Sequence, residues 1–155
     1  MCAGYSGRCV MSNFLTNRYN GHVEINSDVH VVSNFIPTYT EFYPIILNSH
    51  SDSSGSLTIN GGTYESSTVS FLDNYGLGTV TINDANVILN LDEANVYNHR
   101  RTMFTVAQSS SIIINGGYYE TNYDSIFIMR DNILGATADA KIVVGDQTKT
   151  ISNSS

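Results

Sequence analysis

The residues of this chain best suited to acid–base chemistry are one aspartate and an Arg-Asp pair. Asp73 and the pair formed by Arg130 and Asp131 each come at the end of a predicted short strand. A lyase or hydrolase needs clustered carboxylates, or a carboxylate beside a cation, on one face of the molecule. A surface ion pair or turn capping explains the same residues more simply, and we expect that role. The sequence therefore assigns no catalytic residue.

Two segments carry side chains suited to contact with another molecule. Residues 91–101 combine acidic, basic and histidine side chains, which is typical of a solvated loop. Residues 35–43 are rich in aromatic side chains, which suit a protein interface or stacking on a sugar ring. The candidate contact residues in these segments are Phe35, Tyr39, Phe42, Tyr43, His99, Arg100 and Arg101.

No set of residues has the spacing of a metal or cofactor site. The only cysteines, Cys2 and Cys9, have no histidine between them, and the four histidines are far apart in the sequence. The cysteines could close a small loop in an oxidising compartment, but we expect two thiols without a structural role. The Gly-Gly pairs follow predicted strands and precede no helix, so they are not phosphate-binding loops. We expect no metal and no cofactor.

The composition of the chain gives the first indication of its secondary structure. Only 14% of the 155 residues are charged, against roughly 25% in an ordinary soluble domain, and Asn, Ser and Thr take their place. Helical bundles and disordered chains have other compositions. No apolar run approaches the roughly 20 residues that span a membrane, so we expect no membrane insertion. The net charge of -7 lacks the basic footprint of a nucleic-acid binder.

A short internal repeat organises most of the chain. In each copy an apolar residue, any residue and then Ile or Val precede Asn or Gly. Such alternation predicts a strand with one buried face. Two copies continue with Gly-Gly and a second short strand. The copies are His22–Asn26, Ser56–Asn60, Thr79–Asn83, Ser111–Asn115 and Lys141–Gly145.

The spacing of the repeat predicts stacked coils. Successive copies are 34, 23, 32 and 30 residues apart, and the shortest spacing fits one coil of a three-sided parallel β-solenoid. The longer spacings fit the same coil with loop insertions. A third strand is predicted in most coils, with candidates at Tyr43–Leu47, Val69–Leu72, Met103–Val106 and Ser125–Met129.

The last position of the repeat is predicted to form a ladder of stacked side chains. Equivalent residues of stacked coils lie about 4.8 Å apart, where like charges repel and asparagine amides can bond to one another. Asn and Gly also tolerate a left-handed backbone, so we expect a tight bend at this position. The alternative is that Asn marks separate hairpin turns in a β-sandwich. The predicted ladder consists of Asn26, Asn60, Asn83, Asn115 and Gly145.

The segments Leu57–Tyr64 and Ile112–Tyr119 resemble the coils of right-handed parallel β-helix proteins. That group includes pectate-lyase-like enzymes, phage tailspikes and fibres, and repeat regions of bacterial surface proteins. The resemblance covers roughly residues 21–150, and none of the group's catalytic motifs can be matched. It implies an all-β fold: a single-stranded right-handed parallel β-helix of about five coils, at residues 21–155, preceded by an N-terminal arm or cap at residues 1–20.

The function expected from these features is structural. We expect a virion protein, such as a phage capsid decoration, head-fibre or tail-fibre component. It would form a homo-oligomer, with a trimer favoured by the resemblance, and contact other virion or surface proteins through residues 1–20. No secretory signal is visible, and the expected location is the virion or the cell exterior. The alternatives are a polysaccharide-binding or polysaccharide-degrading module and a fragment of a bacterial surface adhesin.

Overall fold

The protein is built from short β-strands. Its structure, a computed structural model, describes residues 13–33, 44–48, 53–90, 102–122, 125–130 and 141–145. Within these ranges every regular element is a strand. The part of the chain so described contains no helix of the length and apolar character needed to cross a membrane.

The described ranges contain fourteen strands in three sheets, which we name A, B and C. Sheet A contains β1 (Leu15–Asn17), β4 (Ile46–Asn48), β7 (Leu72–Asn74), β10 (Thr102–Ala107) and β13 (Ser125–Arg130). Sheet B contains β2 (His22–Ile25), β5 (Ser56–Ile59), β8 (Thr79–Ile82), β11 (Ser111–Ile114) and β14 (Lys141–Val144). Sheet C contains β3 (His30–Ser33), β6 (Thr63–Ser66), β9 (Asn86–Leu89) and β12 (Tyr118–Thr121).

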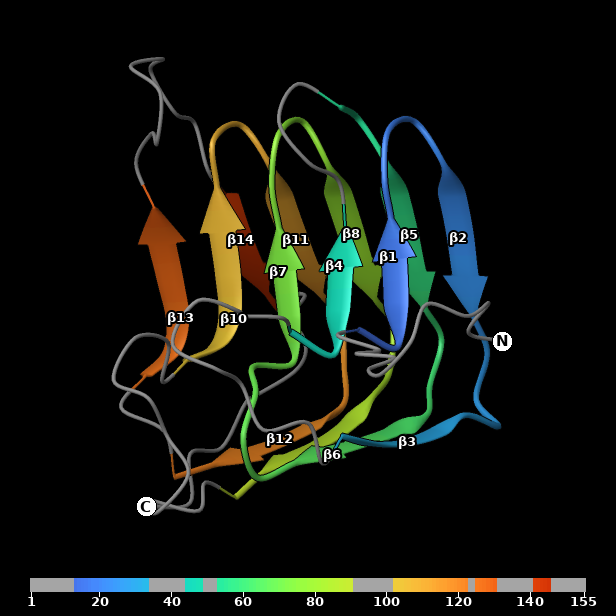
Figure 1. The fold of residues 1–155 in the computed structure, drawn as a ribbon, viewed down its shortest axis with the longest axis vertical. Helices are drawn as coiled ribbons and strands as arrows, with labels where there is room; N and C mark the ends of the chain where they lie inside the picture. Colours follow the sequence, from blue (N-terminus) through green and yellow to red (C-terminus); the bar gives the residue numbers. More distant parts are fainter. Residues whose placement is uncertain are drawn as a thin grey trace, which may run out of the picture.

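The chain visits the three sheets in a fixed order. Each passage runs through a strand of sheet A, then one of sheet B, then one of sheet C, and we call one such passage a round. Figure 1 shows sheet A in front, sheet B behind it and sheet C across the bottom. Strands of successive rounds pair in parallel, as Ile25 pairs with Ile59 and Ile59 with Ile82. This arrangement is compatible with a parallel β-helix.

The alternation in sheet B places one set of side chains in the core. Along β5, Leu57 and Ile59 are buried, while Ser56 and Thr58 between them are only half-buried. The same burial pattern occurs in β11. Because partners in adjacent strands are in register, the buried residues form continuous apolar rows through the sheet. Burial of these rows is the main favourable contribution to folding.

The middle of the core is aromatic. Phe104 of β10 is fully buried and stacks on Phe127 of β13, with ring centroids 5.2 Å apart. Its ring also contacts Phe71 and Tyr119 at centroid distances of 5.6 and 5.7 Å. The ring of Tyr64 adds a contact with Phe71 at 4.8 Å. This cluster joins sheets A and C, since Tyr64 and Tyr119 come from β6 and β12.

The strands of sheet A differ somewhat from their predicted positions. The prediction ended at Leu47 and Leu72, but β4 continues to Asn48 and β7 begins at Leu72 and continues to Asn74. The stretch before β7 was predicted as strand but forms bends from Ser67 to Val69. Side-chain alternation misplaced the strand because Phe71 and Leu72 are both fully buried at a corner of the chain.

Candidate functional site

The outer asparagine ladder, which we define as Asn26, Asn60, Asn83 and Asn115, lies where strands of sheet B end. The Nδ2 of Asn60 donates to Oδ1 of Asn26 at 3.3 Å and to Oε1 of Glu24 at 2.7 Å. The Nδ2 of Asn83 donates to Oδ1 of Asn60 at 2.8 Å, and that of Asn115 to Oδ1 of Asn83 at 2.9 Å. The structure therefore brings these four residues together in one hydrogen-bonded row.

The backbone of this row differs from what we expected. Positive φ angles were predicted for the ladder position, but none of the four asparagines has one. Gly145, at the same position after β14, does, with a φ of 75°. The prediction was wrong for asparagine because its side-chain amide, rather than its tolerance of a left-handed backbone, is used here. The left-handed angles occur two residues further along, at Gly62 and Gly117.

A second, buried ladder was not predicted from the sequence. The inner asparagine ladder consists of Asn17, Asn48 and Asn74, at the ends of β1, β4 and β7. The Nδ2 of Asn17 donates to Oδ1 of Asn48 at 2.8 Å, and the Nδ2 of Asn48 to Oδ1 of Asn74 at 2.9 Å. All three side chains are buried. Their bonds therefore form away from competing water.

The inner ladder also satisfies backbone carbonyls at the corner between sheets A and B. The Nδ2 groups of Asn17, Asn48 and Asn74 donate to the carbonyl oxygens of Gly21, Gly55 and Gly78, in that order, at 3.1, 3.0 and 2.9 Å. Glycine leaves room for the amide, since a Cβ on Gly21 would lie 2.3 Å from Oδ1 of Asn17. An Asn followed four residues later by Gly, as at Asn17 and Asn74, is the sequence signal that could have revealed this ladder.

The Gly-Gly pairs are explained by two tyrosines. The Tyr64 hydroxyl donates to the Gly61 carbonyl at 3.1 Å, and the Tyr119 hydroxyl to the Gly116 carbonyl at 2.9 Å. A Cβ on Gly117 would lie 2.5 Å from the Ala85 carbonyl oxygen. Burial raises the pKa of Tyr64 to about 12. Burial, with the charge of Asp84, also raises the pKa of Tyr119.

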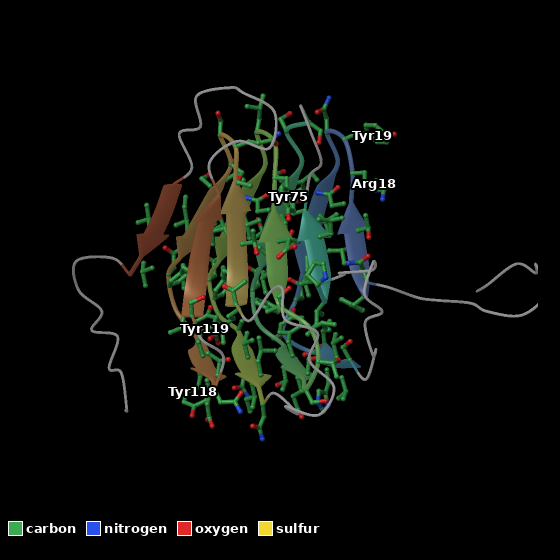
Figure 2. The ribbon with its side chains drawn as sticks, turned by 60° about the vertical axis from the view of Figure 1, so that its left-hand side comes forward. Arg18, Tyr19, Tyr75, Tyr118 and Tyr119 are labelled. Carbon is green, nitrogen blue, oxygen red and sulfur yellow. The ribbon has the colours of Figure 1, made fainter. Side chains whose placement is uncertain are left out.

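The most unusual backbone among the described residues occurs at the corner between sheets A and B. A positive φ occurs in three rounds at the second residue after the row of sheet A that contains Asn17, Asn74 and Val106. The angle is 65° at Tyr19, 65° at Gly76 and 61° at Gln108. Glycine adopts this conformation freely, whereas a side chain such as that of tyrosine is strained by it. Tyr19 is nevertheless 77% exposed. Figure 2 shows Tyr19 and its neighbour Arg18 projecting together from this corner.

The outer face of sheet C carries polar and aromatic side chains. Nε2 of His30 lies 2.9 Å from Oε1 of Glu65 on the next strand, and both side chains are well exposed. On β12 the Tyr118 hydroxyl donates to a carboxylate oxygen of Glu120. This bond and the carboxylate's charge raise the pKa of Tyr118. Figure 2 shows Tyr118 pointing away from the sheet.

Asp73, which we expected in a surface ion pair or a turn cap, is instead buried within β7 of sheet A. It is 1% exposed, and its Oδ2 accepts a bond of 3.3 Å from the Tyr75 hydroxyl. Asp73 pairs with Thr105 of β10, which pairs with Ile128 of β13. Arg130 ends β13, but its side chain and Asp131 lie outside what the structure describes.

Several predicted residues lie outside the described ranges. These are both cysteines, His50 and all the candidate contact residues at Phe35, Tyr39, Phe42, Tyr43, His99, Arg100 and Arg101. Within the described ranges, no three His, Cys, Asp or Glu side chains are grouped as metal ligands.

Comparisons with known proteins give no match, so a functional assignment depends on the residues and the fold. No protein-family model, no curated protein and no solved structure matches this chain.

Proposed function

We propose that this chain is a structural protein that acts by contact, built as a right-handed parallel β-helix of about five coils. The parallel pairing of successive rounds supports the coil, and connections between parallel strands are right-handed in nearly all proteins. The two asparagine ladders support a rigid scaffold, because they bond equivalent side chains of successive rounds. Such a scaffold suits a projecting component of a particle or cell surface.

The observation that carries the contact role is the conformation of Tyr19. Its left-handed backbone is strained, and its ring is largely exposed, so the fold gains little from keeping tyrosine there. Strained residues of this kind are concentrated at functional sites. With Arg18 beside it, Tyr19 supplies an aromatic ring and a cation, two groups that are enriched in protein interfaces. We infer that this corner, within the N-terminal segment 1–20, holds the protein to an acidic surface of its particle.

The particle is most simply a virion, as the resemblance to phage β-helix proteins suggests. Gradient sedimentation of material from the producing cell, probed with an antibody, tests this location. We expect the protein to sediment with particles, and the variant Tyr19→Gly to be partly released at moderate salt. Tyr118→Ala, which removes an exposed tyrosine from sheet C, is the matched control and should stay bound. Wild-type protein that remains among free soluble proteins would contradict the proposal.

A polysaccharide-binding or polysaccharide-degrading role is the second candidate, and the outer face of sheet C favours it. Tyr118 offers an exposed ring for stacking, with Glu120, Glu65 and His30 on the same face as hydrogen-bonding groups. A glycan screen with a reducing-sugar assay separates the two roles. Sugar release that is lost on replacing Asp131 would favour the enzyme over the structural protein. The third candidate is a fragment of a bacterial surface adhesin. The full length of the gene would distinguish it from the other two candidates, because an adhesin gene would encode a longer chain with further repeats.

The proposed assembly is a homo-oligomer, with a trimer favoured by the resemblance. The strands β1, β2 and β3 form one outer edge of the three sheets, and β13, β14 and β12 the other. Outer strands present backbone groups that can pair with another chain. Size-exclusion chromatography with light scattering at about micromolar concentration should give the mass of an oligomer. A clean monomer there would remove this part of the proposal.

A further inference from the structure

Two of the four asparagines in the outer ladder are followed by glycine. These are Asn60, before Gly61, and Asn115, before Gly116. An Asn-Gly peptide can lose ammonia spontaneously, because glycine has no side chain to shield its backbone nitrogen from the neighbouring amide carbon. The same local sequence, Asn-Gly-Gly, thus occurs at two places in one ladder, and the structure treats them differently.

The amide of Asn60 is held on both sides. Its Nδ2 donates to Glu24 and Asn26, and its Oδ1 accepts from Nδ2 of Asn83 at 2.8 Å. The next residue, Gly61, is buried against the preceding round, where a Cβ would lie 2.8 Å from Cα of Ser27. Loss of ammonia requires the Gly61 nitrogen to bond to the side-chain carbon of Asn60, which closes a five-membered ring. To reach that geometry, the Asn60 amide must rotate out of its hydrogen bonds while Gly61 shifts within a packed corner.

Within the described part of the chain, the amide of Asn115 is held on one side only. Its Nδ2 donates to Oδ1 of Asn83 at 2.9 Å. The equivalent position on the next strand is Gly145, which has no side chain to donate to Oδ1 of Asn115. Among the described residues, Oδ1 of Asn115 therefore has no hydrogen-bond donor. Gly116 is half-buried, whereas Gly61 is buried.

We propose that Asn115 is a site of spontaneous deamidation, and that Asn60 is protected from the same reaction by its place inside the ladder. The backbone nitrogen of Gly116, having lost its proton to water or hydroxide, attacks Cγ of Asn115. The C–N bond to the side-chain amide breaks, and ammonia leaves. Water then adds to either carbonyl of the resulting succinimide, which gives aspartate or isoaspartate at position 115.

The product would alter the end of the stack that contains β12 and β14. A carboxylate at position 115 cannot donate to Oδ1 of Asn83, and it places a negative charge next to that oxygen. Isoaspartate also adds a carbon to the main chain between β11 and β12, whose strands pair in register with the preceding round. Modified molecules should therefore lose order in β12 and β14 before the rest of the protein. This inference does not depend on the proposed function.

Incubation of the full-length folded protein at mildly alkaline pH, followed by peptide mapping with mass spectrometry, tests the proposal. We expect Asn115 to deamidate at least about tenfold faster than Asn60, because the Asn60 amide must break three side-chain hydrogen bonds before it can rotate and the Asn115 amide only one. In urea the two sites should react at similar rates, which shows that the difference comes from the fold. Equal rates in the folded protein would overturn the proposal. So would an Asn115 that stays intact while the unfolded protein is modified.

A variant that extends the ladder provides the sharper test. Gly145→Asn places an amide donor beside Oδ1 of Asn115, and asparagine tolerates the positive φ at this position. Asn115 should then deamidate several-fold more slowly, while the rate at Asn60 stays unchanged. Gly116→Ala is the control for the chemistry and should slow Asn115 by shielding the attacking nitrogen. An Asn115 rate unaffected by Gly145→Asn, in a variant that unfolds at the wild-type urea concentration, would contradict the role of the ladder.

Discussion

At the scale of single residues, the two ladders differ in how much their bonds contribute to stability. Asn48 is fully buried, and its amide bonds to both neighbours in the inner ladder and to the Gly55 carbonyl. Asn83 makes equivalent ladder bonds but is exposed. Water can replace the hydrogen-bond partners of Asn83. A buried group that is left without its partner instead destabilises the folded state by its full desolvation penalty.

We therefore predict that Asn48→Ala lowers the free energy of unfolding by about 3 kcal/mol and Asn83→Ala by about 1 kcal/mol or less. Asn83→Ala is the matched control, since it removes the same side chain from the same kind of row. Urea unfolding followed by circular dichroism measures both changes. Equal losses for the two variants would mean that the inner ladder is not buried as described.

The buried hydroxyl of Tyr64 predicts how stability depends on alkaline pH. Burial raises its pKa from 10.0 to about 12, so the folded protein keeps a proton that the unfolded chain loses. This contribution to stability is fully present below about pH 10 and is lost as the pH rises through about 12. Above pH 10 the free energy of unfolding should fall.

Tyr64→Phe removes the part of this dependence that comes from Tyr64, together with the hydrogen bond to Gly61, and leaves the part that comes from Tyr119. Near neutral pH the variant should be less stable than the wild type by about 1 kcal/mol. That difference should shrink as the pH rises above about 10 and reverse in sign by about pH 12, because the wild type loses the contribution of the Tyr64 proton and phenylalanine has no proton to lose. Thermal unfolding at a series of pH values measures it. A stability difference that stays constant over this range would show that Tyr64 ionises freely in the folded state.

At the scale of the elements, the corner between β1 and β2 should be more stable with glycine than with tyrosine. The left-handed backbone of Tyr19 costs about 1–2 kcal/mol, partly offset by the greater freedom of glycine in the unfolded chain. We predict that Tyr19→Gly raises the free energy of unfolding by up to about 1 kcal/mol. Tyr118→Gly, inside β12, should instead lower it, because glycine weakens a strand. A destabilised Tyr19→Gly protein would show that the ring supports the fold.

The elements of sheet B were predictable because their pattern is simple. Alternating side chains such as Leu57 and Ile59 mark each of its strands, followed by asparagine in four strands and by Gly145 after β14. The strands of sheet A were less predictable. Phe71 and Leu72 are consecutive and both buried, so alternation fails where the chain turns a corner. The inner ladder was missed because residue type alone does not distinguish a buried asparagine such as Asn48 from an asparagine in an exposed turn. The glycine four residues after Asn17 and Asn74 is the additional signal.

The positions of the positive φ angles were also not predictable from residue type. Asparagine was the expected residue for them, but tyrosine and glutamine adopt them at Tyr19 and Gln108. The carbonyl groups that the inner ladder satisfies define the path of this corner. These bonds span only four residues, but the residue types at positions 19 and 108 do not reveal the backbone conformation there, so the strained tyrosine became visible only in the structure.

At the scale of the whole molecule, asparagines of the described strands bond to equivalent asparagines in neighbouring rounds. These asparagines form two ladders. The low content of charged residues fits the parallel stacking in register, because like charges on equivalent positions would repel one another. A scaffold of this kind serves best to hold particular groups at its surface. The strained, exposed Tyr19 and its neighbour Arg18 are the described groups that fit this purpose most closely.

The central claim, that the corner at Tyr19 is a contact site of a structural protein, is tested most directly by photo-crosslinking. A photoreactive amino acid replaces Tyr19 in the producing cell, and Tyr118 in a matched control. We predict that position 19 forms an adduct with another protein of the same particle and that position 118 forms none. The claim would be contradicted if particle-bound protein gave no adduct from position 19, or an adduct with a glycan alone.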